Sequence, residues 1–415
     1  MTKKRKKKSP APSSEELDFY DYEKDDGSFL KEVPAPKKRK KKKKRSFWRK
    51  VLIIAVIAVC VYVLANVTSL TPANILQFIN DTAALSHAGE GAYPVDVSEL
   101  NVISAAVDRD RLVLLTDMSA VCYTSSGATL YSRQHGFASP RLSCAKDRCL
   151  IYDSGGNALK IESAGKTLLE ETLGSKILAA DLSDSGVYAV ATKSEGYNAE
   201  ISLYSRGFVK QPFKWYTSDQ EVIAVKVSPN GKLCAVATAA AEGGRLKSYL
   251  YLFDIRKVEQ LAKLEYSGCL LLDLSFKGNS SVTAVGDTLV SFVEIAAPDA
   301  HKDLPFGALS LETFYNGDAS GIAMSFSRHG DAGSGKTVMY DPKGNILFEA
   351  ERDSRVSSLY VSKHYVTELT FSQVSMYDKT GKLVRREETG IDSYRVFEYN
   401  KNIIAIGNSK VEKYE

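Results

Sequence analysis

A repeated strand–turn–strand pattern constrains the fold of this 415-residue chain more than any other feature. The segments ADLSDSGVYAVATKSEG (180–196) and VKVSPNGKLCAVATAAAEG (225–243) align directly. Each contains a strand-like run, a Ser-x-x-Gly turn and a second run that includes Ala-Val-Ala-Thr. Their offset of about 45 residues lies in the range of propeller blades. The pattern therefore predicts a ring of small antiparallel sheets.

The rest of the stretch 93–415 extends this template. Short runs rich in Val, Ile, Leu, Tyr and Thr alternate with Gly, Asn, Asp and Ser, which predicts an all-β domain of four-stranded antiparallel blades. We expect eight blades, or seven if the weak outer strand at 296–306 fails to complete the fifth. The first strands are expected to begin near Val102, Arg141, Ile177, Val222, Leu270, Leu309, Val356 and Asp392.

Two further features support a closed propeller. Hairpins between the outer two strands end in glycine at YTSSG (123–127), YSRG (204–207), YDPKG (340–344) and YDKTG (377–381), where a residue with positive φ is needed. The last repeat contains only three strands. We therefore expect the isolated segment YPVDV (93–97) to close the ring as the fourth strand, because closure protects exposed strand edges.

The segment VKVSPNGKLCAVAT resembles the turn and following strand of WD40-like and quinoprotein-like propellers, although the Trp-Asp ending of true WD40 repeats is absent. Over residues 50–415 the layout is similar to an uncharacterised family of single-pass, membrane-anchored bacterial proteins with an extracytoplasmic β-propeller. The resemblance implies a propeller outside the membrane and no known reaction.

An uncharged stretch, 51–70, separates the propeller from the N-terminus. Twenty helical residues at 1.5 Å each cross a hydrocarbon layer of about 30 Å, so we predict a transmembrane helix. A cleaved signal is the alternative, but a fifty-residue leader is too long for an ordinary one. Lys and Arg are absent from 51–108 and dense before it, which predicts a cytoplasmic N-terminus and an extracytoplasmic C-terminal domain. The topology-determining residues are Lys37, Lys38, Arg39, Lys40, Lys41, Lys42, Lys43, Lys44, Arg45, Arg49 and Lys50.

Charge distinguishes the two sides of this stretch. Residues 1–50 contain 19 Lys and Arg against 8 Asp and Glu, which predicts a disordered, basic cytoplasmic tail. The remainder contains 36 basic and 42 acidic residues, so nucleic acid is not an expected partner of the propeller. The block 37–45 is interpreted as a topology signal that contacts anionic lipid, with a nuclear-import or nucleic-acid patch as the alternative. The acidic, tyrosine-containing segment 15–26 is a spacer or a docking segment.

The linker 71–92 is expected to begin with a short membrane-proximal helix. Thr71 is a suitable N-cap, Pro72 suits the first helical position, and Ile75, Leu76, Phe78 and Ile79 supply apolar side chains. Glycines 89 and 91 are expected to end it.

GDAGSGKT (330–337) matches the phosphate-binding pattern G-x-x-x-x-G-K-T. A phosphate loop must lead into a helix, whereas 338–340 reads as a strand and Pro342 follows closely. We therefore reject nucleotide binding and expect a flexible hairpin loop in blade six.

The cysteines and histidines give little indication of a catalytic or metal site. Cys60 lies in the uncharged stretch, and Cys122, Cys234 and Cys269 occupy apolar strand positions. The turn in CAKDRC would place Cys144 opposite Cys149, which allows either a disulfide or a reduced cross-strand pair. The histidines, at 87, 135, 301, 329 and 364, have no metal-ligand spacing, so no metal or cofactor is expected.

These observations favour a non-catalytic, membrane-tethered propeller that acts as a protein-binding or scaffolding module for an unknown envelope protein. The alternative is an envelope sensor that couples ligand binding on the propeller to the cytoplasmic tail. An enzyme is the third hypothesis, and its active site would be expected among acidic side chains at the propeller axis.

Overall fold

The computed structural model describes residues 48–57, 71–108, 111–317, 319–328, 331–399 and 401–415. The chain divides into two units, 1–65 and 66–415. In the first unit, residues 48–57 form a helix with exposed side chains. Within the described parts of the chain, no helix combines the length and apolar character required to cross a membrane. Residues 1–47 and 58–70, which include the tail, most of the basic cluster and most of the predicted span, lie outside the described residues.

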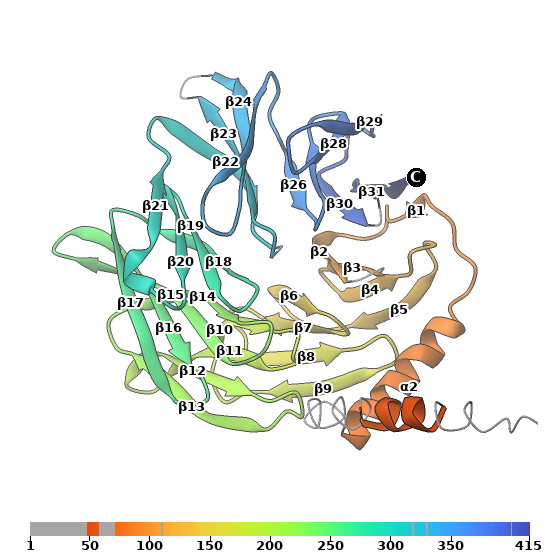
Figure 1. Ribbon diagram of the computed structural model, residues 1–415, viewed down its shortest axis with the longest axis horizontal. Helices are drawn as coiled ribbons and strands as arrows, with labels where there is room; N and C mark the ends of the chain where they lie inside the picture. The colour runs from red at the N-terminus through yellow and green to blue at the C-terminus, as the bar shows by residue number, and fades with distance from the viewer. Residues whose placement is uncertain (1–47, 58–70, 109–110, 318, 329–330, 400) are drawn as a thin grey trace, which may run out of the picture. The chain divides into compact units, whose positions relative to one another are not determined.

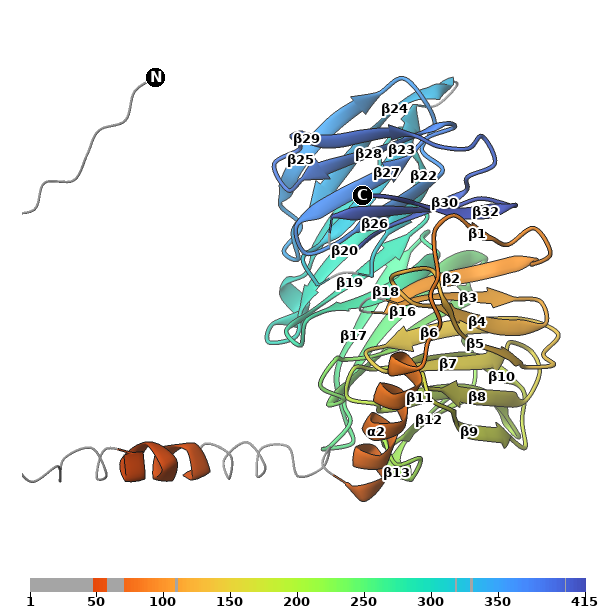
Figure 2. The ribbon, with the colours of Figure 1, turned by 90° about the vertical axis from the view of Figure 1, so that its right-hand side faces the viewer.

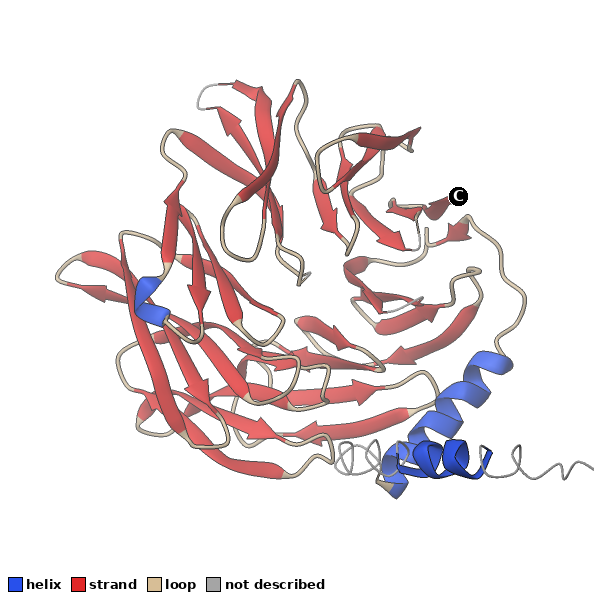
Figure 3. Cartoon of the chain, viewed as in Figure 1, coloured by secondary structure: helices blue, strands red, loops and turns tan. Residues whose placement is uncertain are grey.

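The second unit contains eight four-stranded antiparallel sheets arranged around an axis (Figures 1 and 3). We call each sheet a blade and its strands A to D from the axis outward. Blades one to four are β2 (Val102–Asp108), β3 (Arg111–Thr116), β4 (Ser119–Tyr123), β5 (Thr129–Gln134); β6 (Pro140–Ala145), β7 (Arg148–Asp153), β8 (Ala158–Glu162), β9 (Thr167–Thr172); β10 (Ile177–Leu182), β11 (Tyr188–Ser194), β12 (Tyr197–Tyr204), β13 (Lys210–Thr217); and β14 (Glu221–Val227), β15 (Leu233–Glu242), β16 (Arg245–Asp254), β17 (Glu259–Ser267). Blades five to eight are β18 (Leu271–Lys277), β19 (Ser281–Gly286), β20 (Leu289–Glu294), β21 (Lys302–Pro305); β22 (Leu309–Tyr315), β23 (Ile322–Arg328), β24 (Asp331–Tyr340), β25 (Ile346–Arg352); β26 (Ser358–Val361), β27 (Tyr365–Leu369), β28 (Gln373–Asp378), β29 (Leu383–Glu388); and β30 (Arg395–Tyr399), β31 (Asn402–Ile406), β32 (Lys410–Tyr414), β1 (Val95–Asp96).

The eight-bladed architecture predicted from the repeat is confirmed, and each predicted first strand begins within three residues of the observed one. Blade five is complete because β21 supplies its outer strand after the short 3-10 helix η1 (Pro298–Ala300). In the last blade, β1 pairs antiparallel to β32, with Val95 opposite Val411. The first and last strands of the propeller thus share one sheet.

Strand direction gives the ring two distinct faces (Figure 2). Because successive strands are antiparallel, the A–B and C–D turns of each blade lie at one end, which we call the AB face. The B–C turns and the D–A connections lie at the other end, which we call the BC face. The helix α2 (Pro72–Ser86) contacts turns of the AB face in blade two.

The core lies between neighbouring blades. In the cluster between blades three and four, Phe213 packs edge-on against Phe253 at 5.4 Å, and Trp215 lies 4.7 Å from Tyr251. The second strands of these blades place fully buried alanines at 189, 191, 235 and 237. Small side chains at these positions allow the sheets to approach closely, while aromatic side chains fill the wider outer part.

The outer hairpins follow the predicted turn chemistry with one exception. Gly127, Gly344 and Gly381 adopt φ of 87°, 76° and 83°, so the glycine ending of those hairpins is confirmed. In the YSRG hairpin the prediction is wrong, because Phe208 adopts φ of 66° there. Phe208 contacts the buried cluster between blades two and three, and this packing holds it in a conformation that is costly for a non-glycine residue.

Candidate functional site

A cavity of about 570 Å³ surrounds the propeller axis towards the AB face. Its walls come from A strands and A–B turns of most blades, so residues far apart in sequence converge there. Four charged residues line it: Asp181, Asp184, Lys226 and Asp273. A cavity of this size with a few convergent polar groups is the default location for a ligand site.

Asp181 is held by three neighbouring blades. Its Oδ1 accepts hydrogen bonds from Ser143 Oγ and Lys226 Nζ, both at 3.0 Å, and its Oδ2 accepts one from the backbone N of Val227 at 3.0 Å. The charge of Asp181 raises the pKa of Lys226, although burial acts in the opposite direction, and Asp273 adds to the increase. Because the Asp181 side chain is 8% exposed and both of its carboxylate oxygens are bonded, it joins blades two, three and four and is poorly placed to act as a free base.

Asp273 lies two blades away from Asp181 and has a different environment. Its Oδ2 accepts a hydrogen bond from Asn316 Nδ2 at 3.1 Å, and Lys277 Nζ donates to the backbone O of Asn316 at 2.8 Å. Asn316 is 3% exposed, and its Oδ1 has no hydrogen-bond partner among the described residues. Asn316 therefore links blade six to Asp273 of blade five at the wall of the cavity.

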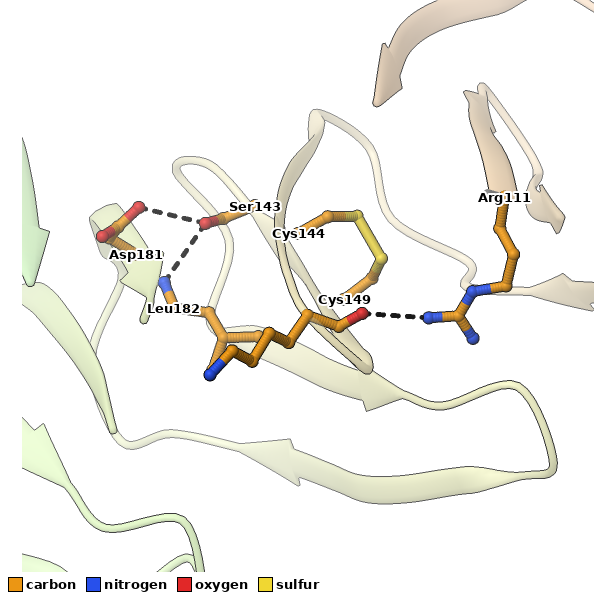
Figure 4. Close-up of a disulfide and its surroundings, with 7 residues drawn as sticks. Arg111, Ser143, Cys144, Cys149, Asp181 and Leu182 are labelled. Carbon is orange, nitrogen blue, oxygen red and sulfur yellow. Dashed lines mark hydrogen bonds between the residues drawn. A yellow bond between two sulfur atoms is a disulfide. The ribbon is translucent and has the colours of Figure 1, made fainter. Parts of the chain in front are cut away.

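A disulfide between Cys144 and Cys149 joins β6 and β7 beside the cavity (Figure 4). Cys144 itself lines the cavity, and its neighbour Ser143 points to Asp181 and accepts a hydrogen bond from the backbone N of Leu182 at 3.1 Å. The pair that sequence analysis left open is therefore oxidised in this structure and braces one wall of the axial cavity.

The BC face has a different character, because large apolar side chains are exposed there. They lie in B–C turns, in D–A connections or at the adjoining strand ends: Ile103, Met118, Tyr197, Tyr216, Ile223, Leu246, Leu272, Phe371 and Ile391. We call this set the BC apolar set. The rings of Tyr197 and Tyr216 lie 4.9 Å apart and form an exposed aromatic pair. On the AB face of the blades, the exposed large apolar side chains belong only to C–D turns or D strands among the described residues, and therefore lie at the perimeter.

The other residues considered from sequence do not form a site. The segment 331–340 is β24. From Gly335 to Tyr340 it pairs with both β23 and β25, whereas its register with β23 is irregular between Asp331 and Gly335, at the β23–β24 hairpin. The segment thus belongs to a hairpin of blade six, and the flexibility of that hairpin stays a prediction. No helix follows Thr337, whose Oγ1 donates to Glu368 at 2.9 Å, and Lys336 pairs with Glu349. No group of three or more potential metal ligands is found within the described residues. Lys37–Arg45 lie outside them, whereas Arg49 and Lys50 belong to the helix 48–57.

Sequence analysis missed the charged residues of the cavity. A signal for them exists in the repeat, because Asp181, Lys226 and Asp273 occupy the same place in the tetrapeptides ADLS, VKVS and LDLS. These tetrapeptides lie in A strands, which line the axis in this architecture. Aligning charged residues within A strands would therefore have identified the three side chains.

Three comparisons relate the chain to other proteins. A protein-family model described as "Family of unknown function (DUF5711)" matches residues 103–415. No curated protein matches the sequence. Among solved structures, BamB from Moraxella catarrhalis is similar with 12% identity and a TM-score of 0.50, over 78% of this chain and 96% of that chain. Kuenenia stuttgartiensis hydrazine synthase is similar with 14% identity and a TM-score of 0.45, over 76% and 96%. The Cps50 (Swd1) β-propeller domain of Myceliophteria thermophila is similar with 12% identity and a TM-score of 0.43, over 77% and 99%.

Proposed function

We propose that this chain, which belongs to the Family of unknown function (DUF5711), is a non-catalytic β-propeller that is tethered to a membrane and binds a protein partner outside the cytoplasm. The observation that carries the proposal is the BC apolar set. Met118, Phe371 and Ile391 are 65%, 69% and 69% exposed, respectively; they lie in blade one, in blade seven and in the connection between blades seven and eight. Large apolar side chains that gather on one face of a folded domain are candidates for an interaction site.

The chemistry of this face suits a protein partner. Aromatic residues and Met are enriched in the buried centres of protein interfaces, and the Tyr197–Tyr216 pair offers a large, rigid contact area. Lys193 and Glu221 form an ion pair nearby at 3.1 Å, so charged groups border the aromatic pair. An apolar centre with a polar border is the usual anatomy of a specific interface.

A binding role is also favoured over catalysis by the axial cavity. The most strongly bonded carboxylate in the cavity, Asp181, forms an ion pair with Lys226 at 3.0 Å and accepts hydrogen bonds at both oxygens. A general base needs a lone pair that is free to accept the proton. Asp181 instead stabilises the ring.

The tether rests on the sequence. Residues 51–70 carry no charge, and eleven Lys and Arg precede them within residues 37–50. We propose that this segment spans the membrane with its basic end in the cytoplasm, where the basic cluster contacts anionic lipid.

Site-specific photo-crosslinking in the source cells tests the binding role on the full chain. Benzoylphenylalanine in place of Met118 or Phe371, on the BC face, is expected to give a discrete adduct that mass spectrometry identifies as a protein. Matched controls replace Val209 or Val258, exposed C–D turn residues of the AB face, and should give no such adduct. Equal adducts from both faces, or none from the BC face, would contradict the proposal.

The sensor alternative requires the tail. Deleting residues 1–36 while keeping Lys37–Lys50 preserves the proposed topology signal. If the tail signals, this deletion abolishes the cellular response but preserves the BC-face adduct. If binding alone is the function, both are retained.

A further inference from the structure

Helix α2 shows its polar side to the propeller. Gln77 and Asp81 are its buried residues, at 3% and 8% exposed, although the helix also contains five large apolar side chains. In a surface helix of a globular protein the apolar stripe normally faces the core. In α2 the side that faces the propeller is polar, so the usual orientation of a surface helix is reversed.

Specific bonds hold this orientation. Arg148 donates to Gln77 Oε1 from Nε at 3.1 Å and from Nη2 at 2.6 Å, and to Asn74 Oδ1 at 3.2 Å. The second anchor is Asp81, whose Oδ1 accepts a hydrogen bond from the backbone N of Gly165 at 2.7 Å. A third bond runs from Gln77 Nε2 to Asp147 Oδ2 at 3.1 Å. The polar side of α2 is therefore satisfied by the AB-face turns of blade two.

The opposite side of α2 is apolar and open. Ile75, Leu76 and Ile79 are 47%, 53% and 55% exposed, and Phe78 beside them is 71% exposed. At 100° per residue, Ile75 and Ile79 lie roughly opposite Gln77 on the helix. Figures 1 and 2 show α2 outside the ring of blades. The described part of the propeller thus leaves this apolar side uncovered.

We infer that the apolar side of α2 lies in the lipid–water interface and sets the orientation of the propeller on the membrane. This inference rests on the proposed tether. The N-cap of α2, Thr71, directly follows the uncharged segment 51–70, so the helix would start where that segment leaves the bilayer. Asp81 is the only charged residue of Pro72–Ser86, and it is bound to Gly165.

The lack of available charge on α2 favours lipid, rather than a charged protein surface, as the partner of its apolar side. An interfacial helix buries its apolar side among headgroups and acyl chains and turns a polar side to water. Such helices usually carry Lys and Arg on the polar side, but in α2 the propeller occupies that side. Insertion is therefore expected to depend on apolar contact and to be insensitive to anionic lipid, which separates it from the basic cluster at 37–50.

Spin-label accessibility on the full chain in neutral phosphatidylcholine nanodiscs tests the inference. A nitroxide is attached at Ile79→Cys in a Cys60→Ala background, since the other free cysteines, at 122, 234 and 269, are buried. The matched control is Val258→Cys, which is 52% exposed in a turn of the propeller, against 55% for Ile79. We expect the label at 79 to gain collisions with oxygen and lose collisions with a water-soluble nickel chelate relative to the label at 258. The same pattern is expected when anionic lipid is added.

Three outcomes overturn the inference. Nickel accessibility at 79 equal to that at 258 places the helix in water. Protection from both reagents indicates a protein contact, and dipolar broadening between labels indicates a second copy of the chain. Loss of the chain from nanodiscs refutes the tether instead, so the two failures are distinguishable. Circular dichroism of each labelled variant checks that the propeller remains folded.

Discussion

Replacing Arg148 with Met is expected to release α2 and leave the propeller intact. Arg148 is 4% exposed and donates to two side chains of the helix, Gln77 and Asn74, while its Nη1 donates to the backbone O of Arg206 at 2.8 Å. Met keeps much of the length and apolar character of the arginine stem, so the change mainly removes hydrogen-bond donors. Asp147 is not left unpaired, because Arg206 Nη2 contacts its Oδ2 at 2.7 Å.

The size of the effect follows from the bonds removed. A hydrogen bond to a charged group contributes about 1.5–3 kcal/mol, so two acceptors on α2 give an upper range of about 3–6 kcal/mol. The destabilisation cannot exceed the free energy of docking α2, because the polar groups of an undocked helix form hydrogen bonds with water instead. We take about 3 kcal/mol, which is about a 100-fold change in the opening equilibrium. An isolated helix of 15 residues is marginal in water, so undocking also unfolds it.

Hydrogen–deuterium exchange with mass spectrometry measures this opening on the full chain in detergent. Exchange in peptides covering 72–86 should accelerate by about 100-fold, with little change in β15 and β16. Arg256→Met is the matched control, because Arg256 is 59% exposed and pairs with Asp254 at 3.2 Å away from α2. Unchanged exchange in 72–86, or equal acceleration throughout the blades, would refute the assigned role of Arg148.

Two other changes test the same structure. Acidification is expected to weaken the contact between the β6–β7 turn of blade two and the β12–β13 turn of blade three. Burial would raise the pKa of Asp147, but the hydrogen bond and charge of Arg206 outweigh it and hold that pKa below its usual range. The stabilising contribution of this ion pair is therefore complete above the ordinary carboxylate pKa of about 4 and is lost as the pH falls through the lower folded value, which exchange in peptides covering 145–150 and 204–210, measured from pH 6 to pH 3, will show. Arg352→Met should lower the free energy of unfolding by about 3–5 kcal/mol in denaturant titration, because it leaves the 2%-exposed Glu368 carboxylate without the Nε donor now 2.7 Å away. Adding Glu368→Leu should restore much of that loss, and a double variant as unstable as Arg352→Met would contradict this explanation.

The blades could be predicted from sequence because each one repeats the same local signals. Strand runs and turn residues recur at similar spacing, so local patterns are sufficient to locate the strands of each blade. The segment 93–97 had no partner in its own neighbourhood, and β1 now occupies the open place in the last blade. The hairpin at Tyr204 shows the limit of this reasoning. Packing of Phe208 in the cluster between blades two and three overrides the glycine preference of the turn.

The orientation of α2 and the axial cluster could not be obtained in this way. Periodicity identified Ile75 and Ile79 as the apolar side of a helix, and that side would ordinarily be buried. The partners that reverse the orientation, Arg148 and Gly165, lie more than seventy positions away in sequence and give no local signal. The axial side chains are likewise brought together only when consecutive blades pack against each other, so the ion pair between Lys226 and Asp181 is a property of the assembled blades.

Docking of α2 is also expected to protect the closure of the ring. The strand β1 pairs with β32 through Val95 and Asp96, and the backbone N of Val97 donates to the O of Ser409 at 2.9 Å, which is a short contact for the strand that receives the chain from the N-terminal side. Tension arriving from residues before Thr71 reaches the bonds of Arg148 and Gly165 on blade two first, since α2 precedes β1 in the chain. Residues 87–94 between α2 and β1 then carry little of that load. If α2 is released, the same tension acts directly on the two-residue pairing. A tethered Arg148→Met variant should therefore lose protection at β1 and β32, whereas the same variant without residues 1–70 should retain it.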